Sequence, residues 1–170
     1  VNQPIFFFGD AFFSGFYLNE ILLRLCPLEV EMPQTYAKYG ETLVALQQLS
    51  TQTDPNTYLK QILRQFEHVL LEELGYSLDF SVDANQAVIA PQQHYYFQLN
   101  DGFMPSAKAS RSTMSGQQIL TMLSYENGRD FNPEQLQLLT KLYRQVITAL
   151  LGDRPLKSRQ LWIQNSQSQS

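Results

Sequence analysis

The side chains best placed to do chemistry are cations, and their chemistry is anion binding. Lys60, Arg64 and His68 are spaced four residues apart, so on a helix they lie along one face, with Leu63 and Phe66 flanking it. Guanidinium and ammonium groups bind carboxylates and phosphates. Taken alone, such a stripe is most simply a solvated basic face of a surface helix.

A second group of cations lies near the C-terminus. Arg154, Lys157 and Arg159 are the densest positive charge in the chain. Two interpretations stay open: contact with phosphates or a neighbouring domain, or charge complementarity at a helix C-terminus with packing against the first helix. Lys108 and Arg111, in a polar segment, are weaker candidates to extend this surface.

Motifs for catalysis are absent from the sequence. It contains no GxSxG, no P-loop and no GxGxxG. His68 and His94 are far apart in sequence and neither belongs to an HExxH motif; isolated histidines usually serve packing or hydrogen bonding. Glu72 and Glu73 are adjacent, so on a helix they point about 100° apart and cannot act as one acid–base pair. We expect no enzyme activity, no catalytic residue and no cofactor.

The overall charge is acidic, with 12 Lys and Arg against 16 Asp and Glu and a net charge of −4. A domain that binds nucleic acid over its whole surface is usually basic, so only a local patch is expected here. The single cysteine, Cys26, excludes an internal disulfide and a cysteine-based zinc site, and favours the reducing cytosol. No segment reaches the roughly 18 apolar residues of a membrane span.

Hydrophobic periodicity predicts a mainly α fold, a helical bundle of about six helices. The helices are expected at residues 11–25, 33–49, 55–74, 115–125, 133–151 and 156–163. Asp10 and Asp54 are predicted N-caps, and Ser115 with Gln118 forms a capping-box pattern. Glu20 and Arg24 are spaced to form an ion pair.

The middle of the chain has a different pattern. Residues 77–112 contain short β-like runs at 88–89 and 95–99, and Asn100-Asp101-Gly102 is a turn signal. We expect a small, irregular β-hairpin module here, inside one helical domain that covers residues 1–164. Residues 165–170 are rich in Gln and Ser and are expected to be a disordered tail.

Three segments together resemble the RecO family of recombination mediators. Gly15 to Leu22, with the sequence GFYLNEIL, resembles a helix near the start of that family's helical domain. Leu63 to Tyr76, LRQFEHVLLEELGY, resembles a second family helix, and Leu151 to Leu161, LGDRPLKSRQL, resembles the family's C-terminal signature. Their order and spacing match as well, and they span nearly the whole chain.

The resemblance implies a protein without turnover chemistry that anneals complementary DNA strands. With its partner RecR, it helps a recombinase onto single-stranded DNA coated by single-stranded-DNA-binding protein (SSB). RecO proteins carry an N-terminal OB-fold that is missing from this chain, which starts with Val1 and not Met, so we expect a processed or partial chain. Many members hold zinc through cysteines in the middle module; this sequence resembles the zinc-free members. The implied location is cytoplasmic, with the nucleoid.

The resemblance also gives the two basic groups a role. The family's helical domain captures the acidic SSB tail, which ends in a phenylalanine carboxylate, and such a site needs an arginine beside an apolar pocket. Arg64 is the predicted anchor, helped by Lys60, Leu63, Phe66 and His68. The C-terminal cluster is predicted to contact DNA or to dock the OB-fold.

Two other interpretations remain at this point. The chain could be a helical protein-interaction or regulatory domain unrelated to DNA, which would not bind an SSB-tail peptide. An enzyme would need an acid, base or nucleophile set brought together in a cleft, which the sequence does not indicate.

Overall fold

A computed structural model describes residues 9–168 of the chain. It divides into two compact units: residues 1–74 together with 150–170, and residues 75–149. The sequence predicted one helical domain with a module at 77–112, whereas in the structure that module joins the two helices that follow it. Residues 1–8, where the predicted domain begins, and residues 169–170, where the predicted tail ends, lie outside the described part.

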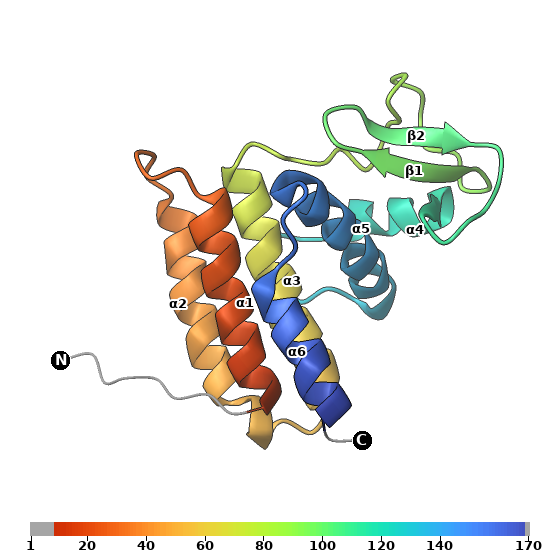
Figure 1. Cartoon of the computed structure of the whole chain (residues 1–170). Helices are drawn as coiled ribbons and strands as arrows, with labels where there is room; N and C mark the ends of the chain where they lie inside the picture. Colours follow the sequence, from red (N-terminus) through yellow and green to blue (C-terminus); the bar gives the residue numbers. More distant parts are fainter. Residues whose placement is uncertain (1–8, 169–170) are drawn as a thin grey trace. The chain divides into compact units, whose positions relative to one another are not determined.

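The first unit is helical. Figure 1 shows α1 lying between α2 and α6, and α2 also contacts α3. The helices are α1 (Gly9–Leu25), α2 (Pro33–Gln47), α3 (Pro55–Glu73) and α6 (Lys157–Ser168), with a short 3-10 turn, η1, at Leu49–Thr51. Leu18, Ile21, Phe66 and Leu70 are completely buried. Their spacing of three and four residues on α1 and α3 gives each helix a buried stripe.

Local capping explains where two of these helices begin. The carboxylate of Asp54 accepts a hydrogen bond from the backbone N–H of Thr57 at 3.1 Å, as the sequence predicted. The predicted cap at Asp10 is wrong, because α1 already begins at Gly9 and Asp10 lies inside its first turn. An acidic side chain there still stabilises the positive end of the helix.

Two predicted apolar surfaces are only partly buried. On α2 the spacing of apolar residues predicts one buried stripe of Tyr36, Tyr39, Leu43 and Leu46; Leu46 is buried, but Tyr36 is 56% exposed. On α1, which is apolar nearly all round, Phe12 and Leu23 are 50% and 83% exposed. Periodicity therefore identified the helices correctly and overstated how much of their surface is covered.

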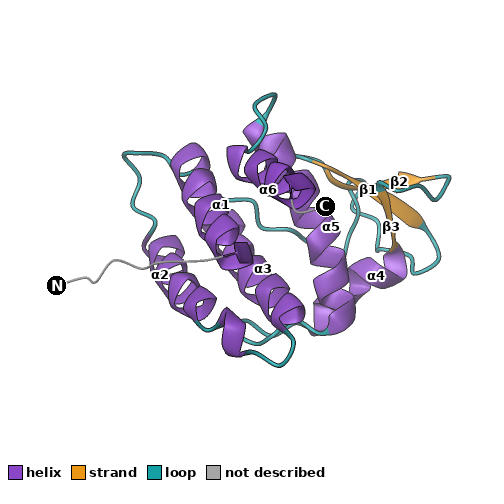
Figure 2. Cartoon of the chain, turned by 60° about the horizontal axis from the view of Figure 1, so that its bottom comes forward, coloured by secondary structure: helices purple, strands orange, loops and turns teal. Residues whose placement is uncertain are grey.

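The second unit combines a small sheet with helices, as Figure 2 shows. The antiparallel sheet has the order β2-β1-β3, one strand more than the predicted hairpin. Its strands are β1 (His94–Gln98), β2 (Gly102–Ser106) and β3 (Thr113–Ser115); α4 (Gly116–Leu120), the 3-10 turn η2 (Thr121–Ser124) and α5 (Pro133–Leu151) follow. The predicted turn is present, with positive φ at Asn100 and Gly102.

The sheet has a buried and a more open face. Tyr95, Phe103 and Met114, one from each strand, are each at most 2% exposed. On α5 the spacing of apolar residues predicts a buried seam of Leu136, Leu139, Tyr143, Val146 and Leu150; the first four are buried and Leu150 is half-buried. Lys141 ties the helix to the sheet by donating a hydrogen bond to the carbonyl of Thr113. The predicted capping box at Ser115 is confirmed.

The C-terminal helix is longer than predicted. α6 continues to Ser168, although residues from 165 onward were expected to be disordered. The hydroxyl groups of Ser166 and Ser168 donate hydrogen bonds to the carbonyls of Trp162 and Gln164, both at 2.9 Å. A serine whose hydroxyl bonds the carbonyl four residues earlier can lie inside a helix. This segment is therefore helical although it is rich in Gln and Ser. No described helix is long and apolar enough to cross a membrane.

A close approach of two backbones in the second unit makes one glycine indispensable. A Cβ atom at Gly116 would lie 1.9 Å from the carbonyl oxygen of Ala90, and neither backbone group can move freely. We predict that Gly116→Ala lowers the free energy of unfolding by at least about 2 kcal/mol in urea denaturation.

Gly40 provides the matched control. It lies inside α2, and a Cβ atom added there would have nothing within 4 Å, so Gly40→Ala should be neutral or stabilise by up to about 1 kcal/mol. Equal effects of the two substitutions would contradict the described packing at Gly116.

Candidate functional site

Glu20 on α1 caps the start of α6. Its two carboxylate oxygens accept hydrogen bonds from the backbone N–H groups of Lys157 at 2.8 Å and Ser158 at 2.9 Å. The first N–H groups of a helix have no partner inside that helix, and the helix dipole makes them attractive to a negative charge. A side chain from the start of the chain therefore fixes where the last helix begins.

Arg24, one turn further along α1, binds the end of α5 and the loop after it. Its guanidinium donates hydrogen bonds to the carbonyl oxygens of Leu151, Arg154 and Pro155 at 3.1, 2.6 and 3.2 Å. The carbonyl of Leu151 is one of the groups that the end of α5 leaves without a partner, and a cation suits the negative end of a helix. The predicted ion pair between Glu20 and Arg24 is confirmed at 3.8 Å.

The environment of Glu20 keeps its carboxylate ionised. Burial alone would raise the pKa of Glu20, but the hydrogen bonds from Ser158 and Lys157 and the charge of Arg24 outweigh it. The pKa of Glu20 is therefore lowered from its usual value of 4.5. The capping interaction is thus fully charged at neutral pH.

Glu20 and Arg24 together form a clamp, because they bind backbone groups of residues 151–158. The cationic side chains in and next to this segment take no part in these contacts. Arg154, Lys157 and Arg159 are all exposed. The main chain of this cluster contacts the first helix, whereas the three charged residues are exposed, so both interpretations of the cluster stay predictions. The arrangement can present three positive charges to an anion from a rigid base.

On α3, the predicted anchor Arg64 already has a partner. Its Nε lies 2.6 Å from one carboxylate oxygen of Glu67, and its Nη2 donates a hydrogen bond to the other at 2.7 Å. Tyr17 of α1 also donates a hydrogen bond to Glu67, which is only 1% exposed. A carboxylate buried to this degree requires such a countercharge.

The rest of the predicted α3 site is not an open binding pocket. Lys60 is exposed and Leu63 half-buried, but Phe66 is completely buried in the core and cannot line an open pocket. His68 lies 3.7 Å from Glu72. The structure places these residues along one helix as expected and gives Arg64 an internal partner, so its role as an anchor stays a prediction.

Lys108 and Arg111 belong to the second unit. Both are exposed in the loop between β2 and β3. Arg154, Lys157 and Arg159 belong to the first unit, so each basic group is tested with its own variants.

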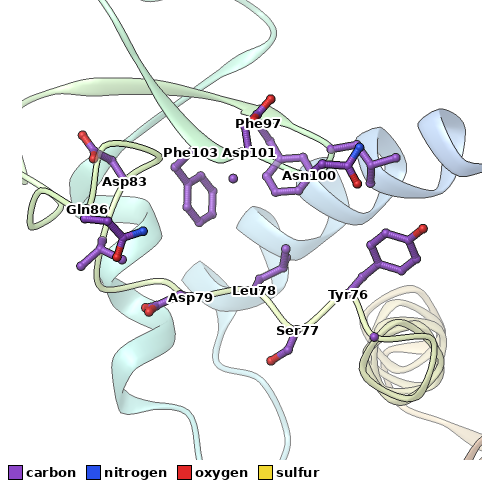
Figure 3. A pocket seen from close by; sticks show the side chains of 14 residues that line it. Tyr76, Ser77, Leu78, Asp79, Asp83, Gln86, Phe97, Asn100, Asp101 and Phe103 are labelled. Atoms are coloured by element: carbon purple, nitrogen blue, oxygen red, sulfur yellow. The ribbon is translucent and has the colours of Figure 1, made fainter.

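The second unit also contains a cavity of about 410 Å³ beside the β1–β2 turn. In Figure 3 the rings of Phe97 and Phe103 lie on one side, and Leu78 lies opposite. Its rim carries three carboxylates, those of Asp79, Asp83 and Asp101. Hydrogen bonds from Ser81 lower the pKa of Asp79, so this rim is negative and does not suit a phosphate or an acidic peptide.

Among residues 9–168, no group of three or more His, Cys, Asp or Glu side chains is placed to hold a metal ion. Cys26 is partly buried, and this burial together with the charge of Glu73 raises the pKa of its thiol. The thiol therefore stays protonated and unreactive at neutral pH.

The sequence identified the cationic residues but not the residues of α1 that hold their surroundings in place. Glu20 was expected only to pair with Arg24, and Tyr17 was given no role beyond an apolar helix. One signal was available: both residues lie inside the GFYLNEIL segment. The structure shows that this segment contacts the other two recognised segments, through Glu67 and through Lys157 with Ser158.

Comparison with known proteins gives a consistent result. The model of the family described as Recombination protein O C terminal matches residues 9–160. The protein named DNA repair protein RecO from Pseudomonas aeruginosa is 35% identical over 160 residues, which are 94% of this chain and 64% of the relative. Proteins of the same name from Tolumonas auensis and Idiomarina loihiensis are 35% and 34% identical over 91% and 95% of this chain. The chain spans less than two thirds of the length of each of these three relatives.

The clamp predicts a pH-dependent contribution to stability. Glu20→Ala should lower the free energy of unfolding at pH 7 by about 1–2 kcal/mol, because two helix N–H groups lose their acceptor. Since the folded-state pKa of Glu20 lies below 4.5, this contribution is complete above pH 4.5 and is lost as pH falls through the folded pKa. Urea denaturation of both proteins between pH 3 and 7 should show the difference shrinking below pH 4.5.

Glu41→Ala is the control, because Glu41 is an exposed residue in a surface ion pair with Lys38. Its removal should change stability by less than about 1 kcal/mol. A Glu20 variant as stable as this control at pH 7 would refute the capping role.

Proposed function

The chain belongs to the recombination protein O family, and on this premise we propose that it is the helical, partner-binding part of a DNA repair and recombination mediator. In this proposal the complete protein anneals complementary strands. Together with RecR it also loads a recombinase onto single-stranded DNA coated by SSB. The chain's contribution is to bind and position partners without changing them chemically. Family membership favours this over a regulatory domain unrelated to DNA.

The observation that carries the proposal is the exposed group of cations in the loop before α6 and in the first turn of α6. Arg154, Lys157 and Arg159 are exposed on a backbone that Glu20 and Arg24 hold. Phosphate contacts dominate the affinity of proteins for nucleic acid, and in an acidic chain they have to come from local clusters of this kind. In the complete protein an N-terminal OB-fold is proposed to supply the main DNA surface, with this loop beside it.

The SSB tail is the second proposed ligand of the same function. Its acidic residues and terminal carboxylate suit the α3 face with Lys60 and Arg64. Because Glu67 holds the guanidinium of Arg64, the tail carboxylate has to share or displace that ion pair. Lys60, which is exposed, is the first cation that the tail would meet.

The loop can be tested through the salt dependence of DNA binding. In the full-length protein, changing Arg154, Lys157 and Arg159 together to Gln should reduce the slope of log K against log salt by up to about 2 for single strands. Affinity should be measured by fluorescence anisotropy from low to physiological salt. A triple variant with the wild-type slope would remove these side chains from the DNA surface.

The α3 site can be tested with a labelled peptide that has the sequence of the SSB tail. We predict that Arg64→Glu lowers the affinity by more than tenfold, that is, by over about 1.4 kcal/mol. Lys60→Glu should weaken binding as well, whereas Lys38→Glu on α2 should not.

Glu67→Gln separates a binding role of Arg64 from a structural one. If Arg64 anchors the tail, freeing its charge from Glu67 should maintain or strengthen binding. Circular dichroism and melting curves have to accompany each variant, because Arg64→Glu places a second carboxylate beside a buried one. Unchanged affinity in both Lys60→Glu and Arg64→Glu would remove α3 from the tail site.

A further inference from the structure

We propose that the open face of the β2-β1-β3 sheet binds single-stranded nucleic acid, with Tyr96 stacking on a base and Lys108 and Arg111 contacting the neighbouring phosphates. The inference rests on the proposed function, since it assumes that nucleic acid is a ligand of the complete protein. It goes further by giving this chain a single-strand site of its own, in the second unit.

Tyr96 is the aromatic side chain on this face. It lies in the central strand directly opposite Met104 of β2 and Thr113 of β3. Directly opposed residues in an antiparallel sheet point to the same face, and the next residue along the strand points to the other. Accordingly Tyr95 is buried, whereas Tyr96 is 38% exposed. An exposed ring in the central strand is a platform on which any base can stack.

The loop that carries the two cations lies on the same face as Tyr96. Thr113, which shares that face, accepts a hydrogen bond through its hydroxyl from the N–H of Ser110 at 2.8 Å. At the other end of the loop, the hydroxyl of Ser106 donates to the carbonyl of Lys108 at 2.9 Å. The strand register places Ser106 on the Tyr96 face too. Both ends of the loop are therefore held over the side of the sheet where the ring is exposed.

The distances suit one nucleotide and its flanking phosphates. Arg111 precedes Thr113 by two residues, and Thr113 is paired with Tyr96. With 3.8 Å between consecutive Cα atoms and about 5 Å across the pair, the Cα atoms of Arg111 and Tyr96 are at most about 13 Å apart. Long cationic side chains cover most of that interval.

Charge is segregated within the second unit. Lys108 and Arg111 are exposed, and Lys141 of α5 reaches the same edge, where it donates to the carbonyl of Thr113. Arg129 lies elsewhere in an ion pair with Glu126 at 2.7 Å. Three of the five Lys and Arg residues of this unit, Lys108, Arg111 and Lys141, therefore lie where the loop and β3 meet, and the fifth, Arg144 of α5, is exposed.

The carboxylates of Asp79, Asp83 and Asp101 surround the cavity beside the β1–β2 turn. This negative end of the module repels phosphates and confines a strand to the side with the cations.

A single strand is a better occupant than an acidic peptide or a duplex. A peptide that ends in an aromatic ring needs an enclosed apolar pocket, and the cavity beside the β1–β2 turn has a negative rim that repels an acidic peptide. In a duplex the bases are already stacked and cannot reach a ring on a flat sheet. A nucleic acid strand needs only an open ring and cations beside it, which this face provides.

The test uses the 170-residue chain and fluorescein-labelled oligo(dT) in anisotropy titrations at low salt. Tyr96→Ala should weaken binding at least fivefold, whereas Tyr96→Phe, which keeps the ring, should stay within about twofold of wild type. Lys108→Gln with Arg111→Gln should reduce the salt slope by about 1.4. Tyr36→Ala, which removes an exposed tyrosine of α2, is the matched control and should bind as wild type does.

Three results would overturn the inference: undiminished oligo(dT) binding by Tyr96→Ala, no binding by the wild-type chain, or equal Tyr96 dependence for a duplex of the same length. Loss of affinity for an acidic, phenylalanine-ended peptide in Tyr96→Ala, with oligo(dT) binding unchanged, would assign the face to a peptide instead. Each of these leaves the proposed function standing, because that function is tested separately by the salt slope of the Arg154, Lys157 and Arg159 variant and by the α3 variants.

Discussion

The first unit depends on one interaction, the capping of the start of α6 by the carboxylate of Glu20. It joins α1 to the start of α6, across 137 and 138 residues of sequence, and satisfies two N–H groups that α6 cannot satisfy alone. Arg24 does the same for the carbonyls at the end of α5 and in the following loop. A loop whose two helix ends are held in this way has a restricted backbone, which limits where the attached cations can lie. Preorganised charge binds an anion with less loss of conformational entropy.

A second buried carboxylate completes the role of α1. Glu67 of α3 receives a hydrogen bond from Tyr17 and an ion pair from Arg64. Two features of the recognised segments, Glu20 in the first and the three-residue spacing of Arg64 and Glu67 in the second, thus have structural reasons. Any ligand role of Arg64 has to be compatible with keeping Glu67 neutralised, since an uncompensated buried carboxylate is strongly destabilising.

Most of the fold could be predicted from the sequence because the residues that start the helices act on their own neighbours in the chain. Asp54, Ser115 and the prolines at helix starts act within one turn, and the structure confirms the helices that they begin. β3 was missed because three residues are too short for an alternating pattern. The role of Glu20 could not be predicted, because its partners are backbone groups that only the tertiary fold brings near. Likewise, spacing predicted a stripe of cations at Arg64, but the burial of Glu67 and its hydrogen bond from Tyr17 of α1 arise only in the tertiary fold.

The most direct test of the central claim is amide hydrogen exchange at Lys157 and Ser158, measured residue by residue. If Glu20 clamps the start of α6, both amides should exchange orders of magnitude more slowly than in an unstructured peptide. In Glu20→Ala they should return to nearly the peptide rate, while the amides of Leu18 and Ile21 stay protected. Fast exchange of both amides in the unmodified protein, or unchanged protection in the variant, would contradict the account.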